Sequence, residues 1–103
     1  FEALASYVFF TATGEEFDAR KIDRNTRFIG ESRNHDVFLL YAEDVPTLRD
    51  LALDLGTARA LPGVSGKRKL VFAPTRYLDD HWLDRLKIDF QQLPYQIYEA
   101  IDG

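Results

Sequence analysis

The residues that could do chemistry begin with a loop rich in glycine. Gly63-Val64-Ser65-Gly66-Lys67 is similar in composition to a nucleotide-binding loop. A P-loop has four residues between its two glycines and joins a strand to a helix whose N-terminus holds the phosphate. Here two residues separate the glycines, and the loop leads into an apolar strand. The sequence therefore favours an ordinary connecting loop over a nucleotide site.

Basic residues surround the apolar run that follows this loop. Lys67, Arg68 and Lys69 precede Leu70–Ala73, and Arg76 comes shortly after it. On a single surface, these side chains would contact the phosphates of DNA or a protein partner. Because alternate residues of a strand face opposite sides, the pattern favours a solubilising lead-in over one basic patch. The four residues remain candidates for contact with DNA or a partner.

Metal ligands and nucleophiles have no convincing arrangement in the sequence. His35 is expected in a turn and His81 in a helix, far from it along the chain. Asp79, Asp80 and Asp84 flank His81, but neighbouring helical residues point in different directions. Asp79 and Asp80 are better explained as acids at a helix N-terminus. Cysteine is absent and no serine has a nucleophile-elbow context, so neither a thiolate site nor a hydrolase triad is predicted.

Aromatic residues make up 14% of the chain, and most of them are expected in the core. Those assigned to the core have apolar neighbours, which argues against a base-stacking platform: Phe9, Phe10, Phe38, Tyr41, Phe72, Trp82 and Phe90. Tyr95 and Tyr98 lie near the C-terminus and are better candidates for exposure. We expect these two tyrosines to contact another domain or subunit.

Composition indicates a soluble globular domain. The length of 103 residues fits a single α/β domain over residues 1–103, and the formal net charge of −4 argues against a dedicated nucleic-acid-binding module. No apolar run approaches the roughly 20 residues of a membrane helix, and no signal-peptide pattern is found. The chain begins at Phe1 and contains no methionine. We therefore expect a fragment of a larger protein.

Residue patterns predict the elements that position these side chains. Strands are expected over Ala5–Thr11, Thr26–Glu31, Val37–Ala42, Leu70–Ala73 and Ile88–Leu93. The second and third would pair as an antiparallel hairpin. The predicted fold is α/β, a small mixed sheet of about five strands, with the hairpin arm followed by a parallel β-α-β-α-β half. Leu70–Ala73 would be its inner strand.

Two helices are expected between these strands. The first begins with Asp44 as N-cap and places Leu48, Leu51, Ala52 and Leu55 on one apolar face. Gly56 is a candidate C-cap, although the helix could continue through Thr57–Leu61. The second helix spans Leu78 to Leu86, with Thr75 as a candidate cap, and Tyr95–Ile101 is expected to form a terminal helical turn.

The C-terminal third resembles the tail of the modification (Mod) subunits of type III restriction–modification systems. Those tails also place a strand that ends in Ala-Pro, here Ala73-Pro74, before a short helix. A second strand then closes on Leu-Pro-Tyr, here Leu93-Pro94-Tyr95. Tyr7–Gly14 and Asp36–Tyr41 are also similar to segments of these proteins, so the resemblance covers most of the chain. It rests on structural motifs and includes no catalytic signature.

The resemblance implies that the parent is a cytoplasmic adenine-N6 DNA methyltransferase that uses S-adenosylmethionine. Its catalytic motif would be Asp/Asn-Pro-Pro-Tyr, of which this chain has only Leu93-Pro94-Tyr95. The chain would thus be a non-catalytic C-terminal domain that holds no cofactor itself. Its partners would be the rest of the methyltransferase chain, a second modification subunit, a restriction subunit or the DNA backbone.

An alternative from a different functional class remains open. A small α/β enzyme or nucleotide-binding domain would have its site at the carboxyl ends of the parallel strands. That end would carry Pro74, Thr75, Arg76 and Pro94. Such a domain is expected to have a well-formed pocket there with convergent polar groups.

Overall fold

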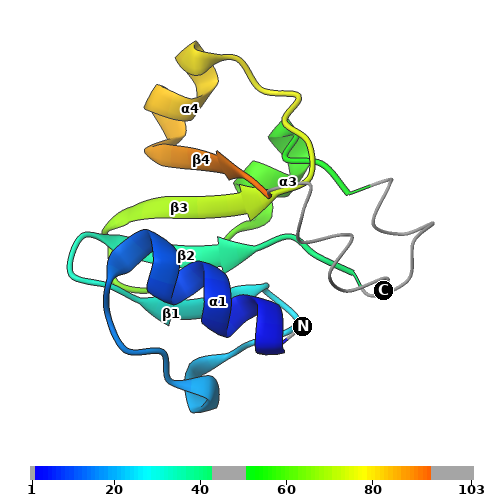
Figure 1. The fold of residues 1–103 in the computed structure, drawn as a ribbon. Coiled ribbons are helices and arrows are strands. Elements are labelled where there is room, and N and C mark those ends of the chain that lie inside the picture. Colours follow the sequence, from blue (N-terminus) through cyan, green and yellow to red (C-terminus); the bar gives the residue numbers. More distant parts are fainter. Residues whose placement is uncertain (1, 43–50, 94–103) are drawn as a thin grey trace.

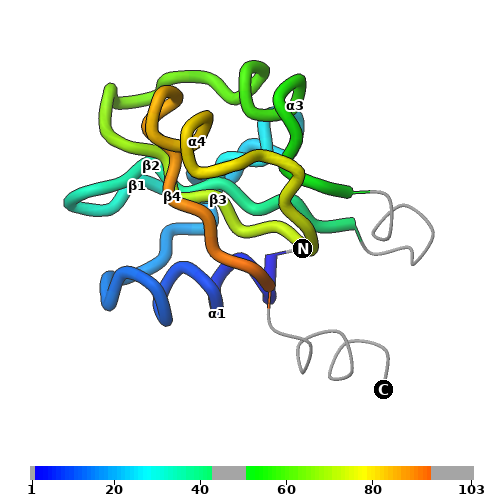
Figure 2. The backbone as a smooth tube through the Cα atoms, turned by 90° about the horizontal axis from the view of Figure 1, so that it is seen from above, coloured from blue at the N-terminus to red at the C-terminus, as the bar shows by residue number. Residues whose placement is uncertain are grey.

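The computed structural model describes residues 2–42 and 51–93. These residues form three layers, with helices on both faces of a central sheet (Figures 1 and 2). The elements are α1 (Glu2–Thr13), the 3-10 helix η1 (Ala19–Lys21), β1 (Phe28–Glu31), β2 (His35–Leu39), α3 (Leu55–Ala60), β3 (Arg68–Ala73), α4 (Asp80–Leu86) and β4 (Ile88–Gln92). Helix α1 covers one face of the sheet, and α3 and α4 lie on the other (Figure 2).

The sheet is mixed, as the sequence predicts, with the strand order β1-β2-β3-β4. Strands β1 and β2 form the predicted antiparallel hairpin, and β2, β3 and β4 run parallel. The inner position predicted for Leu70–Ala73 is confirmed, because β3 lies between β2 and β4. In the part of the chain that the structure describes, the sheet has four strands and not the predicted five or so.

The missing strand is explained by α1. Residues 5–11 are predicted as a strand from their aromatic and β-branched composition, but they belong to a helix. The buried residues of this helix share one face that packs on the sheet: Leu4, Ala5, Val8 and Phe9. Tyr7 and Phe10 lie on the opposite face and are 58% and 62% exposed. The prediction that Phe10 fills the core is therefore wrong.

The helix predicted from Asp44 to Leu55 is not formed at its described end. Residues 44–50 lie outside the described residues, and Leu53 belongs to an extended segment that bridges to Arg76. The backbone N–H of Leu53 donates to the Thr75 carbonyl at 2.8 Å, and its carbonyl accepts from the Tyr77 N–H at 2.9 Å. Leu53 is fully buried, so it fills the core from a strand-like segment.

Aspartates begin both helices of this face. The Asp54 carboxylate accepts a hydrogen bond from the Thr57 N–H at 2.8 Å and starts α3, which places Gly56 inside that helix and not at its end. The Asp79 carboxylate accepts from the Trp82 N–H at 3.0 Å and starts α4. Asp79 therefore caps this helix in place of the predicted Thr75, as its role at the N-terminus suggested.

Each face of the sheet carries its own hydrophobic cluster. Phe38, Leu40, Val71, Leu83 and Ile88 are among the buried residues on the α3 and α4 side. Phe9, Val37, Leu39, Tyr41 and Phe72 are among those on the α1 side. Trp82 and Phe90 are partly buried against the first cluster, so the remaining aromatic predictions agree with the structure. Among the described helices, none combines the length and apolar character needed to cross a membrane.

Candidate functional site

The glycine loop binds an anion that belongs to the chain itself. The Ser65 N–H donates to Asp36 Oδ2 at 2.9 Å, and the Ser65 hydroxyl donates to Asp36 Oδ1 at 2.6 Å. Asp36 lies in β2 and is fully buried. The loop donors that would hold a phosphate are therefore bonded to a carboxylate, which supports the interpretation of a connecting loop.

Three of the basic candidate residues form ion pairs with acidic side chains. Lys67 pairs with Glu31, and its ammonium also donates to the Ser32 carbonyl at 2.9 Å. The Arg76 guanidinium lies 3.0 Å from the Asp80 carboxylate. The third pair is formed by Arg68, described next. Lys69 lies on the opposite face of β3 from Arg68, because alternate residues of a strand point to opposite sides.

Arg68, Asp89 and His35 form a charged network at the amino ends of the parallel strands. Arg68 binds Asp89 through two hydrogen bonds of 3.1 and 2.9 Å. His35 Nε2 lies 2.7 Å from Asp89 Oδ2. The guanidinium of Arg68 lowers the pKa of Asp89 below its usual value. Partial burial raises this pKa, and the hydrogen bond with His35 lowers it by a smaller amount than Arg68 does. Asp89 is therefore held as a carboxylate.

Strand register explains why these three side chains meet. His35 is opposite Arg68 across β2 and β3, and Leu70 is opposite Asp89 across β3 and β4. All three charged residues thus point to the α1 side of the sheet. The sequence predicts a turn at His35, which is instead the first residue of β2, and its pattern does not single out Asp89. Each of the three parallel strands has a polar residue near its start, and this pattern is visible in the sequence. That these residues meet can be predicted only when the strand register is known.

A groove opens between α1 and the β3–β4 half of the sheet, beside this network. Its volume is about 460 Å³. Its surface is mainly apolar, with Val8, Leu70 and Phe72 among its residues. Polar side chains lie on it near both ends of β4, His35 and Asp89 at one end and Gln91 and Gln92 at the other. A molecule that carries both kinds of group could bury its apolar group here and place its polar group beside His35 and Asp89.

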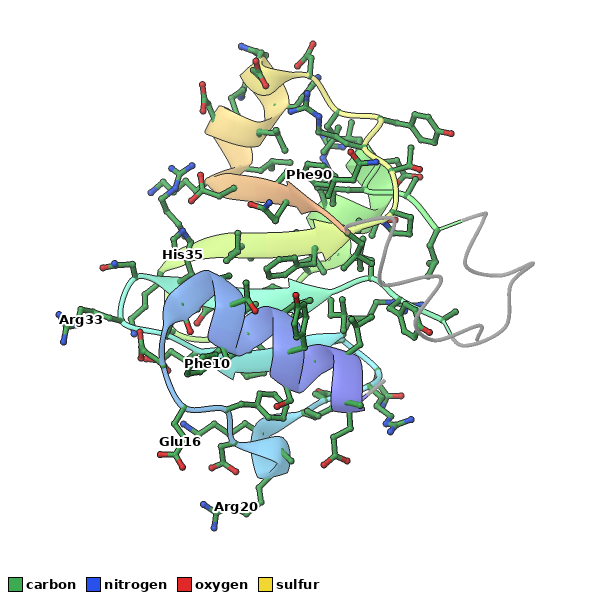
Figure 3. The ribbon with its side chains drawn as sticks, in the orientation of Figure 1. Phe10, Glu16, Arg20, Arg33, His35 and Phe90 are labelled. Carbon is green, nitrogen blue, oxygen red and sulfur yellow. The ribbon has the colours of Figure 1, made fainter. Side chains whose placement is uncertain are left out.

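A second groove of about 450 Å³ lies on the other side of β4, next to α4. Its surface includes Arg76, Asp80, Asp84, Asp89 and Phe90. The guanidinium of Arg76 lies 5.7 Å from the ring centroid of Phe90, which projects from β4 (Figure 3). Asp89 contributes to both grooves, so the two depressions flank the same strand.

Within residues 2–42 and 51–93, no group of three or more metal-ligating side chains comes together. His81 lies beside Trp82, with the ring centroids 6.0 Å apart. Asp79 is bonded to the first turn of α4, and Asp80 to Arg76. These contacts agree with the interpretation of both aspartates as acids at a helix N-terminus.

The carboxyl ends of the parallel strands are only partly described. Gln92 Nε2 donates to the Pro74 carbonyl at 3.3 Å, and the Thr75 carbonyl accepts from the Leu53 N–H. Pro94, Tyr95 and Tyr98 lie outside the described residues, as does the helical turn predicted for Tyr95–Ile101. Comparison with protein-family models, with curated proteins and with solved structures found no match to this chain.

Proposed function

We propose that this chain is a non-catalytic C-terminal domain of an adenine-N6 DNA methyltransferase of a type III restriction–modification system. Its role is assembly. The resemblance of the segment from Lys69 to Tyr98 supports the family, and its described part coincides with one structural unit, β3–α4–β4. Ala73 ends β3 with Pro74 directly after it, and Leu93 directly follows the neighbouring parallel strand β4, so the described parts of both shared motifs lie at strand ends.

The observation that carries the assembly role is the pairing of basic and acidic side chains. Lys67, Arg68 and Arg76 each have a carboxylate partner. A phosphate would have to compete with that carboxylate in every case, which weakens contact with a DNA backbone. The net charge of −4 acts in the same direction. This favours a protein partner over DNA.

Exposed aromatic side chains offer a surface for such a partner. Tyr7 and Phe10 lie on the outer face of α1, and Tyr77, on the segment before α4, is 75% exposed. Large aromatic residues are enriched at protein interfaces, and exposed charged residues are depleted there. The proposed partners are the rest of the methyltransferase chain, a second modification subunit or a restriction subunit. S-adenosylmethionine would bind elsewhere in the parent, in the cytoplasm.

Mixing the chain with a type III modification subunit that lacks its own C-terminal domain tests this proposal. Size-exclusion chromatography with light scattering should show a stoichiometric complex. Replacing the outer aromatics by serine, Tyr7→Ser with Phe10→Ser, should weaken it. Val64→Ser is the matched control, because Val64 is also an exposed apolar residue but lies in the loop before β3. Absence of a complex would reject the methyltransferase role.

DNA and cofactor binding by the isolated chain are measured in parallel. Calorimetry with S-adenosylmethionine should show no heat of binding. Duplex DNA should bind no more tightly than the non-specific range of about 10⁻⁴ to 10⁻⁶ M at physiological salt. If the chain binds DNA more tightly than this and Lys67→Gln and Arg68→Gln abolish that binding, the role would be contact with the DNA backbone and not assembly.

A small α/β ligand-binding domain is a second candidate, supported by the groove beside α1. This groove combines apolar walls with the hydrogen-bonded pair of His35 and Asp89. It extends from His35 and Asp89, near the amino ends of the parallel strands, to Phe72 and Gln92 near their carboxyl ends. The sequence-based alternative placed a site at those carboxyl ends, but Pro74, Thr75 and Arg76 do not line this groove. Titration of ATP and S-adenosylmethionine to millimolar concentration would support this candidate if either ligand shifted the amide resonances of His35 and Asp89.

A further inference from the structure

Strand β4 forms an edge of the sheet. Within the described residues, β4 pairs with β3 alone. The Leu93 N–H donates to the Ala73 carbonyl, and the Lys87 carbonyl accepts from the Lys69 N–H. In a parallel pair the residues that bond to the neighbour alternate along the strand, so Phe90 and Gln92 direct their backbone groups away from β3. These groups can accept another strand.

The two grooves described above lie on opposite faces of this edge. The groove beside α1 is mainly apolar, with Leu70 and Phe72 among its surface residues. The groove beside α4 includes Asp80, Asp84 and Asp89. An extended segment next to β4 would direct alternate side chains toward the two faces of the sheet. One set would face an apolar groove and the other a charged groove.

Charge selects the side chains that suit the groove beside α4. Asp80, Asp84 and Asp89 contribute carboxylates, and Arg76 is the basic residue among the groove's surface residues. Arg76 pairs with Asp80, and Arg68 pairs with Asp89 from the α1 side. Asp84 is exposed and forms no ion pair with a described side chain, and the basic group that acts on it through space is the Arg68 guanidinium, which is already bonded to Asp89. A lysine or arginine of the incoming strand would complement Asp84.

We propose that β4 accepts an extended segment of a partner protein as a fifth strand, with apolar side chains over the α1 groove alternating with basic side chains over Asp84. Backbone hydrogen bonds to Phe90 and Gln92 supply affinity, and the two grooves supply selectivity. This inference deepens the proposed assembly function, on which it rests, by assigning the surface and the chemistry of the partner.

The experiment uses the 103-residue chain and a fluorescein-labelled peptide, Thr-Val-Lys-Val-Lys-Val-Thr. Fluorescence anisotropy should show saturable binding, and the amide resonances of Phe90 and Gln92 should shift. The same peptide with glutamate in place of lysine should bind about tenfold more weakly, and Asp84→Asn should remove most of that difference. Glu16→Gln is the matched control, because Glu16 is also exposed but lies in the loop after α1.

Backbone methylation of the peptide tests strand addition without changing the protein. N-methyl groups on the amides that face β4 should weaken binding about tenfold or more, and N-methyl groups on the alternate amides should not. Equal binding by both methylated peptides would overturn the proposal, as would unshifted amides of Phe90 and Gln92. Self-association of the chain that the peptide cannot displace would also overturn it, because a second copy would then occupy the edge.

The methyltransferase complex separates this inference from the proposed function. Peptide binding together with no complex would reject the methyltransferase role and leave the strand-accepting edge in place. A complex that forms equally well in the presence of saturating peptide, and with Asp84→Lys, would retain the assembly role and overturn the edge as its contact surface.

Discussion

At the scale of single residues, the buried carboxylate of Asp36 is the group that depends most on its hydrogen-bond donors. It is fully buried, and its two oxygens accept hydrogen bonds from the N–H and hydroxyl of Ser65. Ser65→Ala removes the hydroxyl donor and leaves one oxygen without that bond. Because hydrogen bonds to charged groups contribute about 1.5–3 kcal/mol, we expect a loss of unfolding free energy in this range.

Urea denaturation followed by the fluorescence of Trp82 measures this loss. Ser6→Ala is the matched control, because Ser6 is exposed on α1 and alanine suits a helix at least as well as serine. We expect its unfolding free energy to change by less than about 0.5 kcal/mol. Equal stability of the two variants would show that the loop is not held by Asp36.

The network of Arg68, His35 and Asp89 predicts a dependence of stability on acid. The pKa of Asp89 lies below its ordinary value of 3.8 in the folded state. The ionised carboxylate therefore stabilises the fold above pH 3.8, and this contribution is lost as the pH falls through the folded pKa. Asp89→Asn should lower the melting temperature near neutral pH, and the difference from the wild type should disappear in strong acid.

Thermal melts between about pH 7 and pH 2 check this prediction. Arg68→Gln removes the main cause of the lowered pKa of Asp89. Like Asp89→Asn, this variant should therefore lose less melting temperature than the wild type when the pH is lowered over this range. Salt should reduce the neutral-pH difference, because both side chains are 43% exposed. A difference between wild type and Asp89→Asn that is the same at every pH would contradict the ionised pair.

At the scale of elements, the contact between α1 and β1 depends on a glycine. A Cβ atom added to Gly30 would lie 3.0 Å from Cε2 of the Phe9 ring, which is buried under α1. Gly30 also has a φ of 158° and adjoins the irregular register of the hairpin. Gly30→Ala should therefore destabilise the fold by about 1–3 kcal/mol, through displacement of α1.

Chemical denaturation of Gly30→Ala is compared with that of Gly63→Ala. A Cβ atom at Gly63 would have no neighbour within 4 Å, and this glycine has no left-handed backbone. Gly63→Ala should thus be neutral or stabilise by up to about 1 kcal/mol, because alanine restricts the unfolded chain. If Gly30→Ala is equally well tolerated, the ring of Phe9 does not fix the position of α1.

Strand patterns predicted the sheet well, because short continuous apolar runs between polar turns are typical of buried strands. Helix α1 was missed because both of its faces carry apolar residues. Tyr7 and Phe10 on the exposed face conceal the helical period that Val8 and Phe9 share with the start of the helix. Their β propensity then dominated the prediction. Leu53 was included in the helix predicted from Asp44 to Leu55 but not on its apolar face, whereas it is a buried residue in a bridge to Arg76.

The candidate site was less predictable than the sheet, and the reason is its dependence on register. The sequence identified Arg68 and Arg76 as basic residues but contained no indication of their acidic partners, which lie 21 and 4 residues away. The partner of Arg76 is close in sequence, but Arg76 lies in the extended bridge to Leu53 before α4, so helical spacing does not predict this pair. The meeting of Arg68 with Asp89 requires the parallel pairing of β3 with β4.

At the scale of the whole molecule, helices cover the two faces of the sheet unequally. Among the described residues, helices α3 and α4 lie on one face, whereas α1 lies on the other (Figure 2). The groove beside α1 is the consequence, because a single helix does not cover four strands. The exposed Tyr7 of α1 lines this groove. Within the described residues, the groove thus lies on the face that carries α1.

Pairing of charges across the molecule leads to a final prediction. Glu31→Gln with Asp80→Asn removes the carboxylate partners of Lys67 and Arg76 and changes the formal net charge from −4 to −2. The two freed bases should strengthen non-specific DNA binding and steepen its dependence on salt by about 0.9 for each new phosphate contact. Glu2→Gln with Glu16→Gln changes the net charge equally but frees neither base, so it should leave the salt slope unchanged. Equal slopes for both double variants in anisotropy titrations would show that net charge, and not ion pairing, keeps this chain from DNA.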